Sequence, residues 1–342
     1  MNSSAPTTAS VTATDLAVQA RGLVKSFGNF NAVDGIDLEI RRGEVYGVLG
    51  PNGAGKTTTL KMLATLLPID QGEASIFGVD VKRHPHQVRQ LVGVTGQYAS
   101  VDENLTGKEN LLLFGQLLGL SRRRAARTAE ELLESFGLTE AANRQLGKFS
   151  GGMRRRLDLA ASLISRPPLI FLDEPTTGLD PRTRGQMWET IRGLVAGGST
   201  VLLTTQYLDE ADQLADRIAV IDRGLKVAEG TSDELKGSVG ESTLHLRLED
   251  KDHTAMAAQL VESVLGTEPV LTPEAGGLNV AMTDANRAAD VLIALRQAGL
   301  GISTAAVRQP TLDEVFLAIT GHHTEDAEND TDNQNETEEV AS

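Results

Sequence analysis

Residues 50–57 are the part of this sequence whose residue types and spacing point most directly to chemistry. They read Gly50, Pro51, Asn52, Gly53, Ala54, Gly55, Lys56 and Thr57, and so match the phosphate-loop pattern G-x-x-x-x-G-K-[ST]. Glycines let backbone N–H groups wrap around phosphates, and a helix expected to start at Thr58 adds partial positive charge. Lys56 is suited to reach the β- and γ-phosphates, and Thr57 to hold Mg²⁺. A glycine-rich turn with a surface lysine is the alternative interpretation.

Two acidic residues follow a second apolar run. Residues 169–172 are apolar throughout and lead directly into Asp173 and Glu174. Proteins with parallel α/β sheets bind ligands at such carboxyl ends of strands. Asp173 is suited to orient Mg²⁺, directly or through water, and Glu174 to polarise the water that attacks a γ-phosphate. Alone, the pair would indicate an exposed strand terminus, but with the phosphate loop it predicts nucleotide hydrolysis.

The elements that must position these residues alternate over residues 20–238. Short apolar runs and helical patterns follow one another there, which predicts an α/β domain with a largely parallel sheet. The expected strands are residues 44–49, 91–94, 169–172, 200–204 and 218–221. The phosphate loop lies between the first strand and a helix expected over residues 58–66. This is the context that its mechanism requires.

Residues 100–165 have a helical pattern only, which predicts a helical subdomain inserted into the α/β core. Thr106 and Glu109 form a capping-box pattern at the start of its first helix. Ser121 can cap a second helix and Ser150 a third.

The pattern changes at residue 241 and predicts a separate small domain over residues 241–320. Its expected order, β-α-β-β-α-β, is the ferredoxin-like arrangement, closed by a short helix. These residues offer no cluster of acid, base and nucleophile, so we expect a regulatory or dimer-stabilising role. Residues 1–19 are expected to be a disordered lead-in and not a signal peptide. Residues 321–342, which carry eight acidic residues and no Lys or Arg, are expected to be a disordered tail.

Composition narrows the choice of function. The chain has 342 residues, a formal charge of −15 and no Cys, so disulfide scaffolds and cysteine nucleophiles are excluded. The acidic balance argues against nucleic acid as a partner and against bulk attraction to an anionic membrane, because Lys and Arg supply most such binding. The longest strongly apolar stretch, near residues 111–120, is about half the ~20 residues of a spanning helix.

Residues 149–153 (Phe, Ser, Gly, Gly, Met) resemble the signature sequence of the ABC-type ATPases. Gln97 stands where that family has its Q-loop glutamine, Asp180 lies in a segment that resembles the D-loop, and Phe27 is placed like the aromatic residue that stacks on adenine. The resemblance covers residues 20–235. It implies that the nucleotide is ATP and that Gln97 also contacts Mg²⁺. For Phe27, a buried strand residue is the alternative.

The signature residues also suit an anion site. Ser150 and the amides of Gly151 and Gly152, at the start of a helix, can bind phosphate with no side chains in the way. In the family, the signature of one protomer closes over nucleotide held by the phosphate loop of another. The resemblance therefore implies a homodimer of ATPase domains in a head-to-tail ATP sandwich. A helix cap after a flexible turn is the alternative.

One position departs from the family pattern. Gln206 stands where most members have the switch histidine. Its amide can hydrogen-bond a γ-phosphate or the Glu174 carboxylate, but it cannot titrate near neutral pH. We therefore assign Gln206 a γ-phosphate-sensing role and expect Glu174 to dominate catalysis.

Hydrolysis must drive other work, and without a membrane span a transport role requires a separate integral-membrane permease. Residues 96–111, 206–207 and 310–317 resemble ATP-binding subunits of the daunorubicin-resistance type, which power drug export. That resemblance implies a peripheral position on the cytoplasmic side of the cell membrane, with the helical subdomain and the segment after Gln97 against the permease. Export of lipid or polysaccharide and a soluble ABC ATPase acting on ribosomes or DNA are the alternatives.

The arginine triplets at residues 122–124 and 154–156 are expected on solvated helix faces, where the second triplet could support the signature helix.

Overall fold

A computed structural model describes residues 15–95, 101–239, 242–272, 277–282 and 284–321 of the chain. The structure divides near Ser232 into two units, the second of which begins at Asp233. Within these ranges, no helix combines the length and the apolar character needed to cross a membrane.

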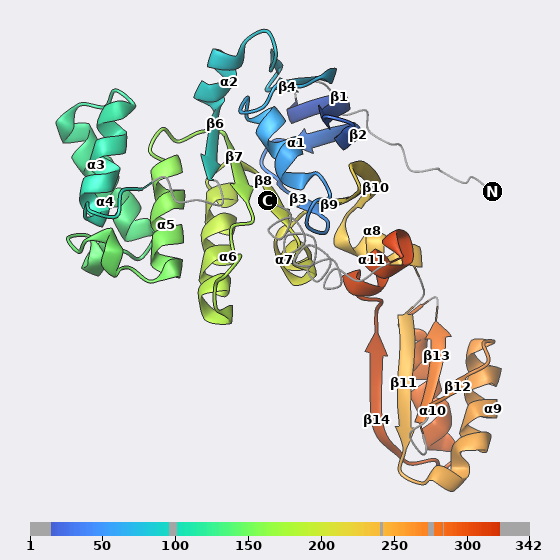
Figure 1. The fold of residues 1–342 in the computed structure, drawn as a ribbon. Helices are drawn as coiled ribbons and strands as arrows, with labels where there is room; N and C mark the ends of the chain where they lie inside the picture. Colours follow the sequence, from blue (N-terminus) through green and yellow to red (C-terminus); the bar gives the residue numbers. More distant parts are fainter. Residues whose placement is uncertain (1–14, 96–100, 240–241, 273–276, 283, 322–342) are drawn as a thin grey trace, which may run out of the picture. The chain divides into compact units, whose positions relative to one another are not determined.

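A six-stranded sheet forms the centre of the first unit, in the order β10-β9-β3-β8-β7-β6 (Figure 1). All neighbours pair in parallel except β9 and β10. The five strands predicted from the apolar runs are present, and β10 is an additional edge strand. The bounds are β3 Val45–Leu49, β6 Val92–Thr95, β7 Leu169–Asp173, β8 Thr200–Thr205, β9 Arg217–Asp222 and β10 Leu225–Gly230.

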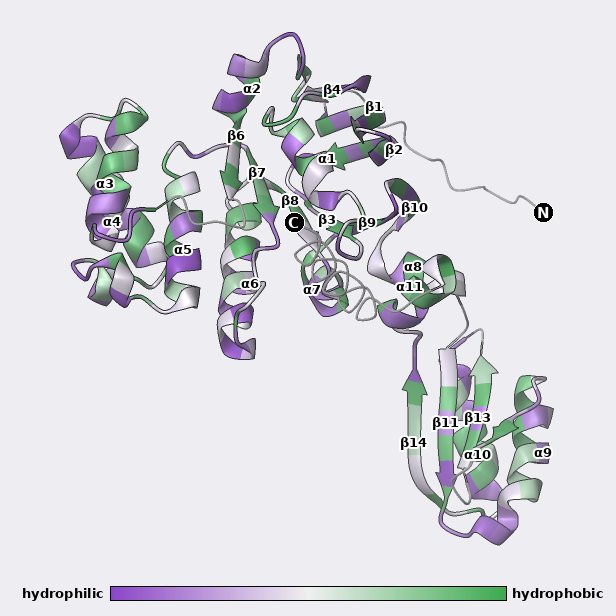
Figure 2. Ribbon diagram, viewed as in Figure 1, coloured by the Kyte–Doolittle hydropathy of each residue, from purple (hydrophilic) through white to green (hydrophobic). Residues whose placement is uncertain are grey.

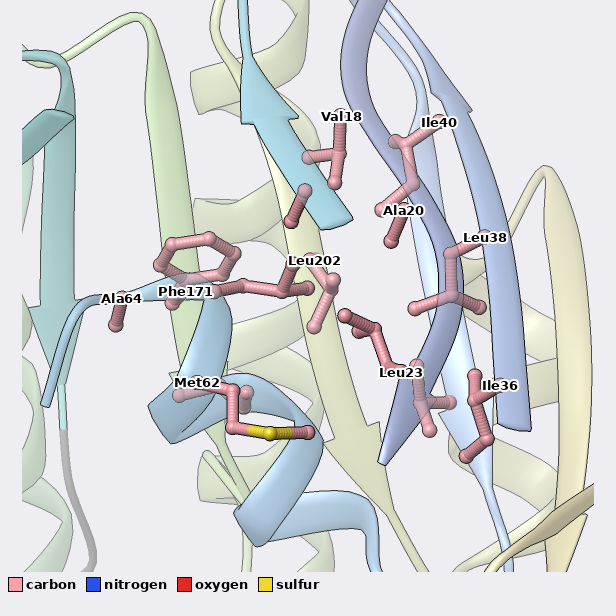
Figure 3. Close-up of a cluster of buried hydrophobic side chains, with 14 of the residues drawn as sticks. Val18, Ala20, Leu23, Ile36, Leu38, Ile40, Met62, Ala64, Phe171 and Leu202 are labelled. Atoms are coloured by element: carbon pink, nitrogen blue, oxygen red, sulfur yellow. The ribbon is translucent and has the colours of Figure 1, made fainter. Parts of the chain in front are cut away.

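Strand β7 shows how the two faces of this sheet are covered. Phe171 belongs to a buried apolar cluster with Leu60, Met62 and Leu63 of α1 (Lys56–Leu63) (Figure 3). Ile170 and Leu172 point to the other face and belong to a second cluster, with residues of α5 (Gly151–Ser162) and α6 (Pro181–Ala196). Because side chains alternate along a strand, α1 and α5 pack on opposite faces of one sheet. Burying each such side chain contributes roughly 1.5–3 kcal/mol.

A second sheet in this unit, β2-β1-β4-β5, is antiparallel and was not predicted from the sequence. It consists of β1 Leu16–Phe27, β2 Phe30–Arg41, β4 Gln71–Ile76 and β5 Val79–Asp80. Register shifts interrupt β1, including one between Ala20 and Leu23, so its apolar residues do not alternate regularly. The prediction of disorder through residue 19 is wrong for the last four residues, because β1 begins at Leu16 and Leu16–Val18 is buried against the core.

The helical subdomain contains α3 Gly107–Leu117, α4 Arg122–Ser135 and α5. The capping box of Thr106 and Glu109 is present, and Ser121 and Ser150 cap α4 and α5 as expected. The remaining helices of the first unit are α2 Pro85–Leu91 and α7 Leu208–Leu214, and α8 Ser232–Val239 begins at the boundary. Helix α1 begins two residues earlier than predicted, directly after Gly55.

The second unit follows the predicted β-α-β-β-α-β order. Its elements are β11 Ser242–Leu248, α9 Thr254–Leu265, β12 Val270–Leu271, β13 Gly277–Met282, α10 Arg287–Gln297, β14 Ile302–Arg308 and α11 Leu312–Thr320. The antiparallel sheet has the order β12-β13-β11-β14, which is the ferredoxin-like strand order. One face of the sheet packs on α9 and α10, with Leu246, Val261 and Val291 in the core.

Candidate nucleotide site

Three neighbouring parallel strands bring the predicted site residues to one edge of the sheet. Strand β3 leads into the phosphate loop, β7 ends at Asp173, and β8, which lies between them, ends one residue before Gln206. The Gly50 amide donates a hydrogen bond to the Thr205 carbonyl oxygen at 3.3 Å, and so connects the loop to the end of β8. The carboxyl edge of an α/β sheet is where such folds bind ligands.

Glycine is required at two positions of the phosphate loop. A Cβ atom on Gly50 would lie 2.1 Å from the Ile221 carbonyl oxygen, and one on Gly55 would lie 2.3 Å from the Ala32 carbonyl oxygen. Gly55 also has φ +105°, a backbone conformation that residues with a side chain rarely adopt. Pro51 and Ala54 are buried, whereas Asn52 and Gly53 face solvent. The tight packing of the loop therefore fixes the backbone whose amides would contact phosphates.

Lys56 lies buried inside this loop. Its ammonium donates hydrogen bonds to the carbonyl oxygens of Gly50 at 2.7 Å and Pro51 at 3.0 Å, and lies 3.6 Å from Glu174 Oε1. Burial lowers the pKa of Lys56, while the nearby carboxylates of Glu174 and Asp173 oppose that shift. The lysine is thus held by backbone oxygens at the place where the pattern requires it.

Thr57 and Asp173 lie in direct contact across the site. The Thr57 hydroxyl donates to Asp173 Oδ1 at 2.8 Å, and the buried Thr204 hydroxyl donates to the same oxygen at 2.6 Å. Thr58, the next residue of α1, is half-buried. Among the described residues no group of three His, Cys, Asp or Glu side chains gathers. A hydroxyl and one carboxylate are hard oxygen donors that suit Mg²⁺ completed by phosphates and water.

Glu174 is held in a strained backbone conformation. Its φ is +48°, in the left-handed region that non-glycine residues seldom occupy. The Glu174 amide donates to the carbonyl oxygen of Thr204 at 3.1 Å and to its hydroxyl at 3.2 Å, and Thr177 donates to Glu174 Oε2 at 3.2 Å. Such outliers cost about 1–3 kcal/mol and cluster at functional sites. The carboxylate is buried beside Lys56, where it can act on a water molecule next to a bound phosphate.

The signature residues begin α5. The Ser150 hydroxyl accepts the Met153 amide at 3.3 Å. A Cβ atom on Gly152 would lie 2.3 Å from the Thr183 methyl group, whereas one on Gly151 would meet nothing within 4 Å. Asp180 caps α6 and accepts from Thr183 at 3.0 Å and 2.6 Å. Gly152 therefore serves packing within the chain, while Gly151 leaves an open approach to the helix start.

Arg155, in the middle of the second arginine triplet, joins the signature helix to the end of β7, which agrees with the supporting role expected for that triplet. Its guanidinium donates to the carbonyl oxygens of Asp173 at 2.7 Å, Glu174 at 2.9 Å and Pro175 at 3.2 Å. The prediction of a solvated arginine face is wrong for Arg155 and Arg156, since Arg156 donates to the Phe136 carbonyl oxygen at 3.0 Å. Arg154 makes a surface ion pair with Glu103 at 2.5 Å. Nothing in the sequence pattern identifies hydrogen bonds to the backbone of a distant strand.

Glu210 of α7 is a residue that the sequence reasoning missed. It is fully buried four residues after Gln206, and Trp188 Nε1 donates to its Oε1 at 3.4 Å. Burial raises the pKa of Glu210, and hydrogen bonding from Thr205 and Thr176 opposes the shift. An acidic residue on a short amphipathic helix gives no sequence signal of burial.

The remaining predicted residues are placed as follows. Gln206 is half-buried after β8, and Arg184 lies 4.7 Å over the ring of the adjacent Tyr207. Phe27, at the end of β1, is 50% exposed, so its alternative role as a buried strand residue is wrong, and its stacking role stays a prediction. Gln97 lies outside the described residues.

Comparisons with known proteins agree with this arrangement. Residues 33–177 match the family described as ABC transporter, and residues 230–320 match the C-terminal domain of the DrrA1-3-like ATP-binding proteins. The daunorubicin/doxorubicin resistance ATP-binding protein DrrA of Streptomyces peucetius is 53% identical over 310 residues, covering 91% of this chain and 94% of that protein. The chain belongs to the ABC transporter ATP-binding family. It is an ATP-hydrolysing subunit with the P-loop fold and a DrrA-like C-terminal domain.

Two further similarities each cover a little under two thirds of this ABC subunit. The Nod factor export ATP-binding protein I of Burkholderia lata is 46% identical over 213 residues, 62% of this chain and 70% of that protein. A solved dimeric ATP-binding cassette in a post-hydrolysis state, bound to ADP and phosphate, has a TM-score of 0.58 and 26% identity over 63% of this chain and 98% of its own. The likeness to the DrrA protein spans both units of the chain.

Proposed function

We propose that this ABC ATPase hydrolyses Mg²⁺-ATP in a head-to-tail homodimer and powers drug export through a separate permease, at the cytoplasmic side of the membrane. The observation that carries the proposal is the likeness to a daunorubicin/doxorubicin resistance protein along 91% of the chain, beyond the ATPase unit itself. The soluble alternative acting on ribosomes or DNA has no comparable support.

The arrangement of α1 and α5 supports a composite site. The phosphate-loop helix and the signature helix pack on opposite faces of the six-stranded sheet. Gly151 has no side chain and leaves open the approach to the start of α5, where the first backbone amides of the helix point outward. A second copy related by two-fold symmetry can therefore bring its signature to this chain's phosphate loop, and a dimeric relative with ADP and phosphate exists in the family.

Thr57 and Asp173 are the residues that would hold Mg²⁺, together with Gln97. When bound, the ion neutralises phosphate charge and orients the γ-phosphate. The protein's contribution is positional: the Thr204 hydroxyl fixes the Asp173 carboxylate, and α1 fixes Thr57.

Glu174 is the residue that we assign to the attacking water. Its carboxylate, buried beside Lys56 and Thr177, would accept a hydrogen bond from that water and orient it in line with the γ-phosphate. Gln206 would donate its amide to the γ-phosphate or to Glu174 and report that ATP is present. An amide carries no titratable proton, so this step would not depend on pH near neutrality.

A groove between the sheet edge and the helical subdomain supports the permease contact. Its volume is about 520 Å³, and it is lined by residues of β6, α3 and α5 that include Val94, Phe114, Leu118 and Ala161. Leu113 and Leu117 of α3 are also exposed. An amphipathic helix of a permease could place its apolar face there.

Drug accumulation tests the export role. Cells that express the chain with the permease of a neighbouring gene should accumulate less daunorubicin than cells with the permease and Lys56→Ala. Equal accumulation would contradict drug export. Export of lipid or polysaccharide is the alternative, to be tested in the same cells.

A further inference from the structure

The connection between α3 and α4 presents exposed leucines and arginines next to one another. Leu117 is 73% exposed and Leu118 is 55% exposed at the end of α3, while Arg123 and Arg124 are exposed at the start of α4. Figure 2 shows hydrophobic segments of α3 beside hydrophilic segments of α4. We call residues 117–124 the α3–α4 tip. Neither the nucleotide site nor the groove uses its arginines.

A depression of about 570 Å³ extends from this tip along α4. Four arginines and one glutamate line it, namely Arg123, Arg124, Arg127, Arg166 and Glu131, with hydroxyls from Ser121, Thr128 and Ser165. Glu131 accepts from Arg127 Nε at 2.9 Å and from an Arg166 terminal nitrogen at 2.9 Å. One carboxylate therefore orients two guanidinium groups, and positive charge remains in excess. Guanidinium groups and hydroxyls in this arrangement match phosphate oxygens.

The depression is continuous with the groove that we assign to the permease. Leu120, Ile164 and Ser165 line both. This step rests on the proposed function: if the groove receives a permease helix, the tip lies beside a protein embedded in the membrane. Phospholipid headgroups surround an embedded protein at the membrane surface, so they are the lipid groups that the tip would meet first.

We propose that the α3–α4 tip and the four arginines of the adjoining depression bind the phosphate headgroups of anionic phospholipids. Leu117, which is outside the lining of the groove, is an exposed apolar residue beside basic ones. This is the pattern of an interfacial membrane contact, where apolar side chains enter the boundary and cations meet the headgroups. The formal charge of −15 does not oppose this, because charges more than about 8 Å away are largely screened at physiological ionic strength. The net charge of the chain, used above to argue against an anionic membrane, is therefore the wrong quantity for this surface.

Vesicle binding by the full chain tests the proposal. Flotation with mixed phosphatidylglycerol and phosphatidylcholine vesicles is compared with flotation on phosphatidylcholine alone, at low and high salt. Arg123→Gln with Arg124→Gln should weaken binding to the anionic vesicles on the order of 10- to 30-fold, and Arg123→Lys with Arg124→Lys should keep most of it. Arg21→Gln with Lys61→Gln, which removes two exposed charges from the same unit, is the matched control and should bind like the wild type.

The outcomes distinguish a lipid contact from a protein contact. ATP hydrolysis by the glutamine pair should equal that of the wild type, which shows that the variant is folded and keeps this test separate from the ATPase assignment. Equal binding to both vesicle types, or equal binding by the glutamine pair and the wild type, would overturn the proposal. Loss of co-purification with the permease in detergent, with lipid binding unchanged, would assign the arginines to a protein contact and also overturn it.

Discussion

At the scale of single residues, the two glycines of the signature have different tasks. A methyl group on Gly151 meets no atom of this chain, so Gly151→Ala should raise the free energy of unfolding by about 0.5–1 kcal/mol, because alanine restricts the unfolded chain. In the proposed dimer the same methyl group would stand where the partner's nucleotide approaches, and we expect ATP turnover to fall about tenfold or more. Urea unfolding and steady-state hydrolysis measure the two effects. A variant as active as the wild type would contradict the role assigned to this approach.

Gly152→Ala is the matched control, because its methyl group would lie 2.3 Å from Thr183 Cγ2. Rotating Thr183 away would break the 2.6 Å bond from its hydroxyl to Asp180. We expect a loss of about 1–3 kcal/mol in urea unfolding. Unchanged stability would mean that α5 and α6 separate more easily than the structure indicates.

Glu210 gives a pH-dependent expectation. Its pKa is raised in the folded state, so the folded protein holds the proton more tightly than the unfolded chain, and this residue destabilises the fold increasingly as pH rises above the unfolded value of about 4.3. A glutamine in its place carries no charge at any pH and has no such cost. Glu210→Gln should therefore be relatively more stable at pH 7.5 than at pH 5, when compared with the wild type in urea. A difference between the two proteins that does not change with pH would contradict a raised pKa.

At the scale of elements, Arg155 fixes α5 against the end of β7 through three carbonyl oxygens. Arg155→Ala leaves these partly buried acceptors without their charged donor, and we expect a loss of about 3 kcal/mol. Arg154→Ala removes a surface ion pair one position earlier and should cost less than about 1 kcal/mol. Similar losses for the two variants, measured by urea unfolding, would show that Arg155 does not connect these elements.

The elements differ in how well the sequence predicts them. Strands β7, β8 and β9 are buried on both faces, so their apolar runs predict them to within one or two residues. Capping residues such as Thr106 and Ser150 predict helix starts because their hydroxyls satisfy local amides. The antiparallel sheet was missed because register shifts in β1 break its alternation, and β10 because it is a half-exposed edge strand. The contacts of Arg155 and Glu210 could not be predicted, since their partners lie on other elements.

At the scale of the whole molecule, the described residues of the nucleotide site belong to the first unit. A chain that ends at Val239 keeps every predicted residue of the site. It should therefore bind ATP with an affinity within about threefold of the full chain, which is a difference in binding free energy well below the 1.4 kcal/mol of a tenfold change. Fluorescent nucleotide titration measures this. Loss of ATP binding by a folded truncation would show that the C-terminal domain takes part in the site.

In the proposed dimer, Glu174 drives ATP hydrolysis at a composite site. The most direct test is Mg²⁺-dependent ATP hydrolysis by the wild type and Glu174→Gln, with size-exclusion chromatography of both in ATP. We expect the variant to lose turnover by a factor on the order of 100 or more, since a positioned acid–base group contributes about that much, and to remain a dimer while ATP is bound. Hydrolysis by Glu174→Gln at the wild-type rate would contradict the catalytic role of Glu174.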